Sequence, residues 1–86
     1  MSDVKTRGNV IVNKIEIGDV LYEYALGSEI KSEVITKPQR DTDGYWTWKS
    51  KIISNGDIID YGVHERYAHY GPKLYDHQAY IGLRKV

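Results

Sequence analysis

The stretch Tyr45–Val63, with the sequence YWTWKSKIISNGDIIDYGV, decides the fold class of this chain. The pair Asn55-Gly56 at its centre is the preferred sequence for a two-residue type I′ turn, because both positions of that turn need a positive φ. Apolar and polar residues alternate on both sides of the pair, as they do in strands with one buried face. The stretch therefore predicts a β-hairpin with strands at Tyr45–Ile53 and Asp57–Val63.

A turn confined to these two residues also fixes which residues face each other across the hairpin. In that register Trp48 lies opposite Val63, and Lys51 lies opposite Asp60 as a cross-strand charge pair. One face then collects the apolar side chains, and we assign it to the core: Trp46, Trp48, Ile52, Ile59, Tyr61 and Val63. The opposite face is polar: Thr47, Lys49, Lys51 and Asp60.

The segment Ile15–Leu26 (IEIGDVLYEYAL) predicts a further strand. Gly18-Asp19 interrupts its alternation, as a tight bend or a β-bulge does. After the interruption Val20, Tyr22 and Tyr24 share one face, which we assign to the core.

Four more elements complete the chain. A two-residue turn at Gly27-Ser28 would mismatch the faces of the strands that it joins, so we expect a longer loop there. Pro38 cannot extend a hydrogen-bonded ladder, so its surroundings form a loop. The elements are a strand at Ile30–Lys37, a polar loop at Lys37–Gly44, at most one helical turn within His64–Tyr70, and a short strand at Ala79–Leu83.

Five short strands with local connections and little helix predict a mostly β fold. A five-stranded antiparallel barrel is an economical way to hide edge strands in a chain of 86 residues. A chain of this length holds one core, so we expect a single domain over residues 13–86. We expect residues 1–12 to be a flexible N-terminal arm, because the stretch MSDVKTRGN is polar.

The composition argues against several classes of function. Basic and acidic residues balance at 12 each, which argues against a dedicated nucleic-acid binder and against an acidic DNA mimic. The chain has no cysteine and therefore no disulfide or thiolate site. No apolar run reaches the roughly 20 residues of a membrane-spanning helix, and Met1–Val12 lacks the apolar stretch of a signal peptide. We expect a cytoplasmic protein that does not enter membranes.

The order of the predicted elements resembles that of SH3-like barrels. In that family a Gly-Asp pair flanked by apolar residues, here Gly18-Asp19 within Ile15–Tyr24, leads the chain into the barrel. A polar loop, a tryptophan-bearing strand, an Asn-Gly hairpin and a short last strand follow. The resemblance covers about residues 15–84 and implies a five-stranded SH3-like barrel. It does not extend to the recognition of proline-rich peptides, because Tyr22 and Tyr24 share the face assigned to the core.

A second resemblance concerns the stretch Gly71–Tyr75 (GPKLY), which follows Tyr67 and Tyr70. It is similar to small accessory proteins of large tailed bacteriophages, several of which block host defence or redirect host enzymes. This resemblance implies a phage-encoded protein that acts on a host protein, and it brings no catalytic residues with it.

The sequence offers no arrangement typical of an enzyme or a metal site. His64 and His69 are five residues apart, which is about 500° of helix rotation, so they point away from each other. The zinc-binding pair of a metalloprotease helix is four residues apart. The serines lie in tails, turns and strand interiors, and the glycines form no phosphate-binding loop. We therefore predict no catalytic residue, no cofactor and no metal.

Residues 61–80 hold five of the eight tyrosines and all three histidines, more than one edge of a small core can absorb. Tyrosine, histidine and arginine suit a protein interface, and the same residues can stack on bases and bind phosphate. Arg40 can reach this surface from the polar loop, and Trp46 is the tryptophan that we expect to be partly exposed. The candidate binding residues are Arg40, Trp46, His64, Arg66, Tyr67, His69, Tyr70, Lys73 and Tyr75.

Three functions fit these residues. The favoured one is a non-catalytic protein that occludes or redirects a host protein. The first alternative is a homo-oligomeric sponge for a signalling nucleotide, and the second is a barrel that binds nucleic acid weakly. Arg66 and Lys73 supply little local positive charge for phosphate, which favours the protein partner.

Overall fold

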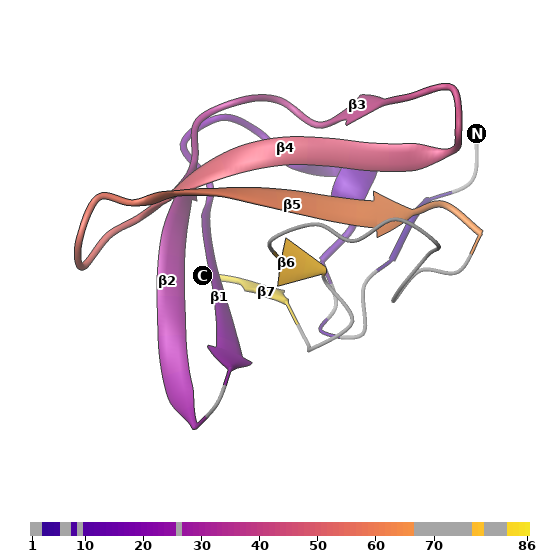
Figure 1. Cartoon of the computed structure of the whole chain (residues 1–86). Coiled ribbons are helices and arrows are strands. Elements are labelled where there is room, and N and C mark those ends of the chain that lie inside the picture. Colours follow the sequence, from indigo (N-terminus) through magenta and orange to yellow (C-terminus); the bar gives the residue numbers. More distant parts are fainter. Residues whose placement is uncertain (1–2, 6–7, 9, 26, 67–76, 79–82) are drawn as a thin grey trace.

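Seven strands are linked into one sheet in the computed structural model, which describes residues 3–5, 8, 10–25, 27–66, 77–78 and 83–86. The strand order is β6-β5-β4-β2-β1-β7, and β3 pairs with β4 beside this path (Figure 1). The strands are β1 Val20–Ala25, β2 Ser28–Val34, β3 Gln39–Arg40, β4 Tyr45–Ile52, β5 Ile58–His64, β6 His77–Gln78 and β7 Arg84–Lys85. Within the described residues the only helical element is a 3₁₀ turn at Val12–Lys14, so the predicted mostly β fold is confirmed.

The sheet is antiparallel except where β5 runs parallel to β6. Figure 1 shows the β1–β2 hairpin running steeply across the β4–β5 pair, so that the sheet wraps around its interior. The two ends of the strand order, β6 and β7, form no ladder with each other in the described part of the chain. The sheet is therefore open there, and a closed SH3-like barrel stays a prediction.

The hairpin of β4 and β5 is confirmed, but its register differs from the predicted one by two residues. Trp48 pairs with Tyr61 rather than with Val63. The loop has four residues, 53–56, because Gly56 N–H donates to the Ile52 carbonyl and Ile52 N–H donates to the Asp57 carbonyl, both at 2.8 Å. A shift by two residues keeps every side chain on its predicted face, since the strand period is two.

The wider loop has a local cause in its own side chains. Asn55 Oδ1 accepts the backbone N–H of Asp57 at 2.9 Å, so the asparagine caps the turn. Gly56 alone then ends the loop in the left-handed region, with φ 80°. The predicted charge pair is wrong for the same reason: Lys49 Nζ, not that of Lys51, lies 2.6 Å from Asp60 Oδ1.

The face of β1 that we assigned to the core is wrong. Leu21 and Glu23 are fully buried, whereas Tyr22 is partly exposed. The alternation of VLYEYA fits either orientation, and a carboxylate at position 23 marked the wrong face as polar. Its burial is offset by a hydrogen bond, because the Tyr61 hydroxyl donates to Glu23 Oε1 at 3.2 Å.

The connection between β1 and β2 is also tighter than predicted. Ala25 pairs with Ser28, so only residues 26 and 27 lie between the strands. Gly27 has φ 80°, a conformation that glycine adopts without steric cost. The resulting register places Ser32 and Val34 in the interior, both fully buried.

The core begins before the domain boundary that we expected at residue 13. Val12 N–H donates to the Val4 carbonyl at 2.8 Å, and Lys5 forms a β-bridge with Ile11. Val4, Val10 and Val12 are buried in the same cluster as the core residues of the strands, so this part of the expected N-terminal arm packs against the sheet. The core cluster contains Val4, Val10, Val12, Ile15, Leu21, Val34, Trp48, Ile59, Tyr61, Val63 and Leu83.

Replacing Gly56 with alanine is expected to lower the free energy of unfolding by about 1 kcal/mol, because a residue with a Cβ is strained at this φ. The methyl group itself has room, since its nearest neighbour would be Lys51 Cε at 3.6 Å. Urea denaturation measures the change, with Ser54→Ala in the same loop as the control. A loss no larger than that of the control would contradict the left-handed conformation of Gly56.

Burial, followed by the charge of Glu23, raises the pKa of Tyr61 far above the usual value of about 10. Above pH about 10 the phenol of Tyr61 ionises in the unfolded chain but not in the folded one. The free energy of unfolding is therefore unaffected by this group below that pH and falls as the pH rises beyond it. Denaturation between pH 8 and 11.5, compared with Tyr61→Phe, tests this; Tyr22→Phe at a partly exposed tyrosine is the matched control. An equal alkaline loss in all three proteins would contradict the burial of Tyr61.

Candidate functional site

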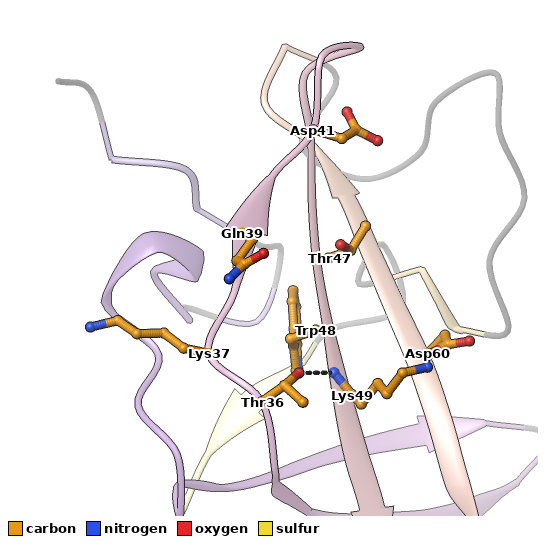
Figure 2. A pocket seen from close by; sticks show the side chains of 8 residues that line it. All are labelled: Thr36, Lys37, Gln39, Asp41, Thr47, Trp48, Lys49 and Asp60. Carbon is orange, nitrogen blue, oxygen red and sulfur yellow. Dashed lines mark hydrogen bonds and ion pairs between the residues drawn. The ribbon is translucent and has the colours of Figure 1, made fainter.

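Two adjoining features form the candidate site, one over the sheet and one at its end. We call the first the polar groove; it has a volume of about 520 Å³ and is lined by Thr36, Lys37, Gln39, Asp41, Thr47, Trp48, Lys49 and Asp60 (Figure 2). We call the second the loop cluster; it lies where β4 begins and β5 ends and contains Arg40, Asp41, Asp43, Gly44, His64, Glu65 and Arg66. Asp41 belongs to both features.

The polar groove exists because residues 36–41, which we call the strap, leave β4 and rejoin it. Thr36 is held against Lys49 by two bonds: Lys49 N–H donates to Thr36 Oγ1 at 2.8 Å, and Thr36 N–H donates to the Lys49 carbonyl at 3.4 Å. The strap pairs with β4 again where Gln39 faces Thr47. Three residue steps of the strap therefore span two steps of β4, and Pro38 in between has no N–H to donate. Figure 2 shows Trp48 between the ribbons of the strap and β4 in this view; its side chain belongs to the core and lies beneath the groove.

Each charged side chain that lines the polar groove already has an ion-pair or hydrogen-bond partner in the same chain. Lys49 lies 2.6 Å from Asp60, and Lys37 Nζ lies 3.6 Å from Glu16 Oε2. Asp41 Oδ1 accepts the backbone N–H groups of Asp43 and Tyr45, both at 2.9 Å, and so shapes the loop before β4. The lining has two lysines and two aspartates and no net formal charge.

A bidentate ion pair holds the loop cluster together. Arg40 Nε donates to Glu65 Oε2 and Nη2 donates to Glu65 Oε1, both at 2.7 Å. Glu65 N–H also donates to the Gly44 carbonyl at 2.9 Å. Gly44 has φ 89°, and a Cβ there would lie 3.1 Å from Glu65 Oε1, so a side chain would crowd this contact. Both oxygens of the carboxylate are engaged, so the pair ties the guanidinium of Arg40 to the loop that follows β5.

The ring of His64 forms hydrogen bonds to the loop before β4 and to the residues that follow β5. Its Nε2 lies 3.1 Å from the Asp43 carbonyl, and its Nδ1 accepts the backbone N–H of Arg66 at 3.1 Å. A carbonyl only accepts, so Nε2 is the donor in the first contact, and Nδ1 is the acceptor in the second. The ring also packs edge-on against buried Tyr45, with centroids 4.8 Å apart at an interplanar angle of 87°. This histidine organises the loops and offers little free surface for stacking.

The structure brings together four of the predicted binding residues. Arg40, His64 and Arg66 meet in the loop cluster, and Trp46 faces Arg40 in the β3–β4 register. Trp46 is partly exposed, as expected, and packs against the core. The other five lie outside the described residues: Tyr67, His69, Tyr70, Lys73 and Tyr75.

Neither Glu65 nor the polar groove was predicted from the sequence. Glu65 is 25 residues from Arg40, and no local pattern indicates their pairing. The polar side chains of the groove follow the alternation of an ordinary solvated sheet face. One signal was available: Pro38 forces the strap away from β4 and so opens the groove.

Neither metal nor membrane chemistry finds support in the described residues. No three His, Cys, Asp or Glu side chains there lie close enough to hold a metal ion. No helix in that part of the chain has the length and apolarity to cross a membrane. Comparison with known proteins found no matching family model, curated protein or solved structure. The site therefore has to be interpreted from its own geometry.

The hydrogen bond from Arg40 lowers the pKa of Glu65, and the charge of Arg40 adds to the shift. Because the value falls on folding, the ion pair contributes stability above the ordinary glutamate range near pH 4.3 and is lost as the pH drops through the lowered value. The carboxyl ¹³C shift of Glu65, followed by NMR against pH, measures the titration. Arg40→Gln is expected to move it upward, and Lys37→Gln, which breaks a different ion pair, is expected to leave it unchanged. A titration of Glu65 that is indifferent to Arg40→Gln would contradict the pairing.

Proposed function

We propose that this protein is a non-catalytic binding module that uses the loop cluster and the polar groove to engage another protein. The observation that carries the proposal is the pairing of three of the four basic side chains in the two features. Lys37, Arg40 and Lys49 each lie within ion-pair distance of a carboxylate of the same chain. A surface of paired charges, hydroxyls and amides has little attraction for phosphate but suits the polar rim of a protein interface.

The apolar contribution to this interface comes from the aromatic residues. Trp46 is partly exposed beside the loop cluster, and Tyr67 and Tyr70, which the sequence analysis names as candidate binding residues, follow Arg66 in the chain. Aromatic side chains give a large contact area at a low cost in rotamer entropy. A few such anchors inside a polar rim account for most of the affinity in typical complexes.

The partner that we propose is a host protein in the cytoplasm, which the protein occludes or redirects. This part of the proposal is supported by the resemblance to phage accessory proteins and by the balanced charge of the chain. The nucleotide alternative is weakened because Arg40 already holds Glu65 in a bidentate pair. Weak nucleic-acid binding is disfavoured by the same pairing of cations, since affinity for nucleic acid follows the number of phosphates neutralised.

The proposal is tested with a partner isolated on the tagged protein and then titrated against purified variants. Replacing Arg66, Tyr67 and Tyr70 together with alanine is expected to weaken binding at least 30-fold without lowering the melting temperature. Lys31→Ala, on the distant β1–β2 hairpin, is the control and is expected to bind as the parent protein does. Retained binding by the triple variant would count against the proposed surface.

Salt and nucleotides separate the proposed partner from the alternatives. We expect the affinity to change less than threefold between 50 and 300 mM salt, whereas a ligand held through two phosphates loses about tenfold. A panel of cyclic dinucleotides is expected to give no thermal shift. A salt-sensitive affinity, or a shift with any nucleotide, would contradict the protein-binding function.

A further inference from the structure

The polar groove has a definite chemistry of its own. We propose that it holds an extended, electrically neutral segment of the partner polypeptide, bound through Thr36, Gln39 and Thr47. This inference rests on the proposed function, because it names the part of a protein partner that enters the groove.

The shape of the polar groove fits an extended chain. The strap has six residues, so its five residue steps span at most about 18 Å. A partner segment of five or six extended residues has the same length and can run alongside the strap. The volume of about 520 Å³ lies within the range of sites that bind small ligands and short peptide segments.

The uncharged side chains of the groove match the hydrogen-bonding needs of a peptide backbone. Each peptide unit carries both a donor and an acceptor, and so do the amide of Gln39 and the hydroxyl of a threonine. Gln39 and Thr47 face each other in the β3–β4 register and flank the groove together with Thr36 (Figure 2). Thr36 Oγ1 accepts Lys49 N–H, which leaves its hydroxyl hydrogen for an outside acceptor.

The charges of the groove select against a charged segment. The Lys49–Asp60 pair is about half exposed, with side-chain exposures of 53% and 48%, so a ligand can touch either end of it. An acidic segment would face Asp60, and a basic one would face Lys49. A neutral segment leaves the pair intact and avoids the cost of an uncompensated charge.

The wall of the groove is preformed. Trp48 is only 2% exposed, and its ring stacks on Tyr61 with centroids 5.1 Å apart and an interplanar angle of 12°. The stack fixes the tryptophan beneath the groove, because its ring belongs to the core. A segment that lies in the groove therefore meets a floor that is already rigid and pays little to order it.

The test selects ligands from a displayed library of random 12-residue peptides with the full chain as bait. We expect the selected peptides to have a net charge between −1 and +1 and to shift the backbone NMR signals of residues 36–41 and 47–49. Thr47→Val, which keeps the shape and removes the hydroxyl, and Gln39→Ala are each expected to weaken binding about tenfold. Lys51→Ala lies on the same face of β4 beyond the groove and is the matched control, expected to bind as the parent protein does. Each variant is first checked for an unchanged melting temperature.

Several outcomes would overturn the inference: strongly charged selected peptides, unchanged affinity in Gln39→Ala and Thr47→Val, or no selected peptide at all. Peptides that bind at the loop cluster and lose affinity only with Arg66→Ala would overturn the groove site while leaving the proposed function standing. A thermal shift with a cyclic dinucleotide in the absence of any peptide or protein ligand would overturn both.

Discussion

Strand β4 is the constraint on which the rest of the structure depends, because it pairs with three other strands. It forms ladders with β2, β3 and β5, and its alternation decides what lies inside and what faces water. Trp48 and Ser50 point into the interior, while Thr47 and Lys49 lie on the outer face that lines the groove. A slip of one residue would exchange the two sets, so the core and the candidate site are fixed by the same register.

The sequence was sufficient for the features of the fold that follow from local chemistry. Alternation on both sides of Asn55-Gly56 identified the β4–β5 hairpin and its buried face. The same alternation tolerates a shift by two residues, which is why the register and the partner of Asp60 were wrong. The orientation of β1 could not be predicted, because the cost of burying Glu23 is offset by Tyr61, a residue 38 positions away.

For the candidate site, too, the sequence identified some of the residues but not the contacts that they make. Arg40, His64 and Arg66 were named from their residue types, and the strands bring them to one end of the sheet. Their roles depended on contacts that the sequence does not reveal. Arg40 was expected only to reach the binding surface, and it pairs with Glu65 across two loops. His64 was expected on the same surface, and its ring contacts the Asp43 carbonyl.

One aromatic stack joins the core of the protein to the polar groove. Trp48 forms part of the groove and lies against Tyr61, whose hydroxyl holds the buried carboxylate of Glu23. A polar contact in the core of so small a domain costs stability unless its groups are satisfied. Here that contact orients the ring on which the groove wall rests, so a change at Glu23 would reach the groove without touching its surface. The shape of the polar groove is therefore a property of the core as much as of the strap that borders it.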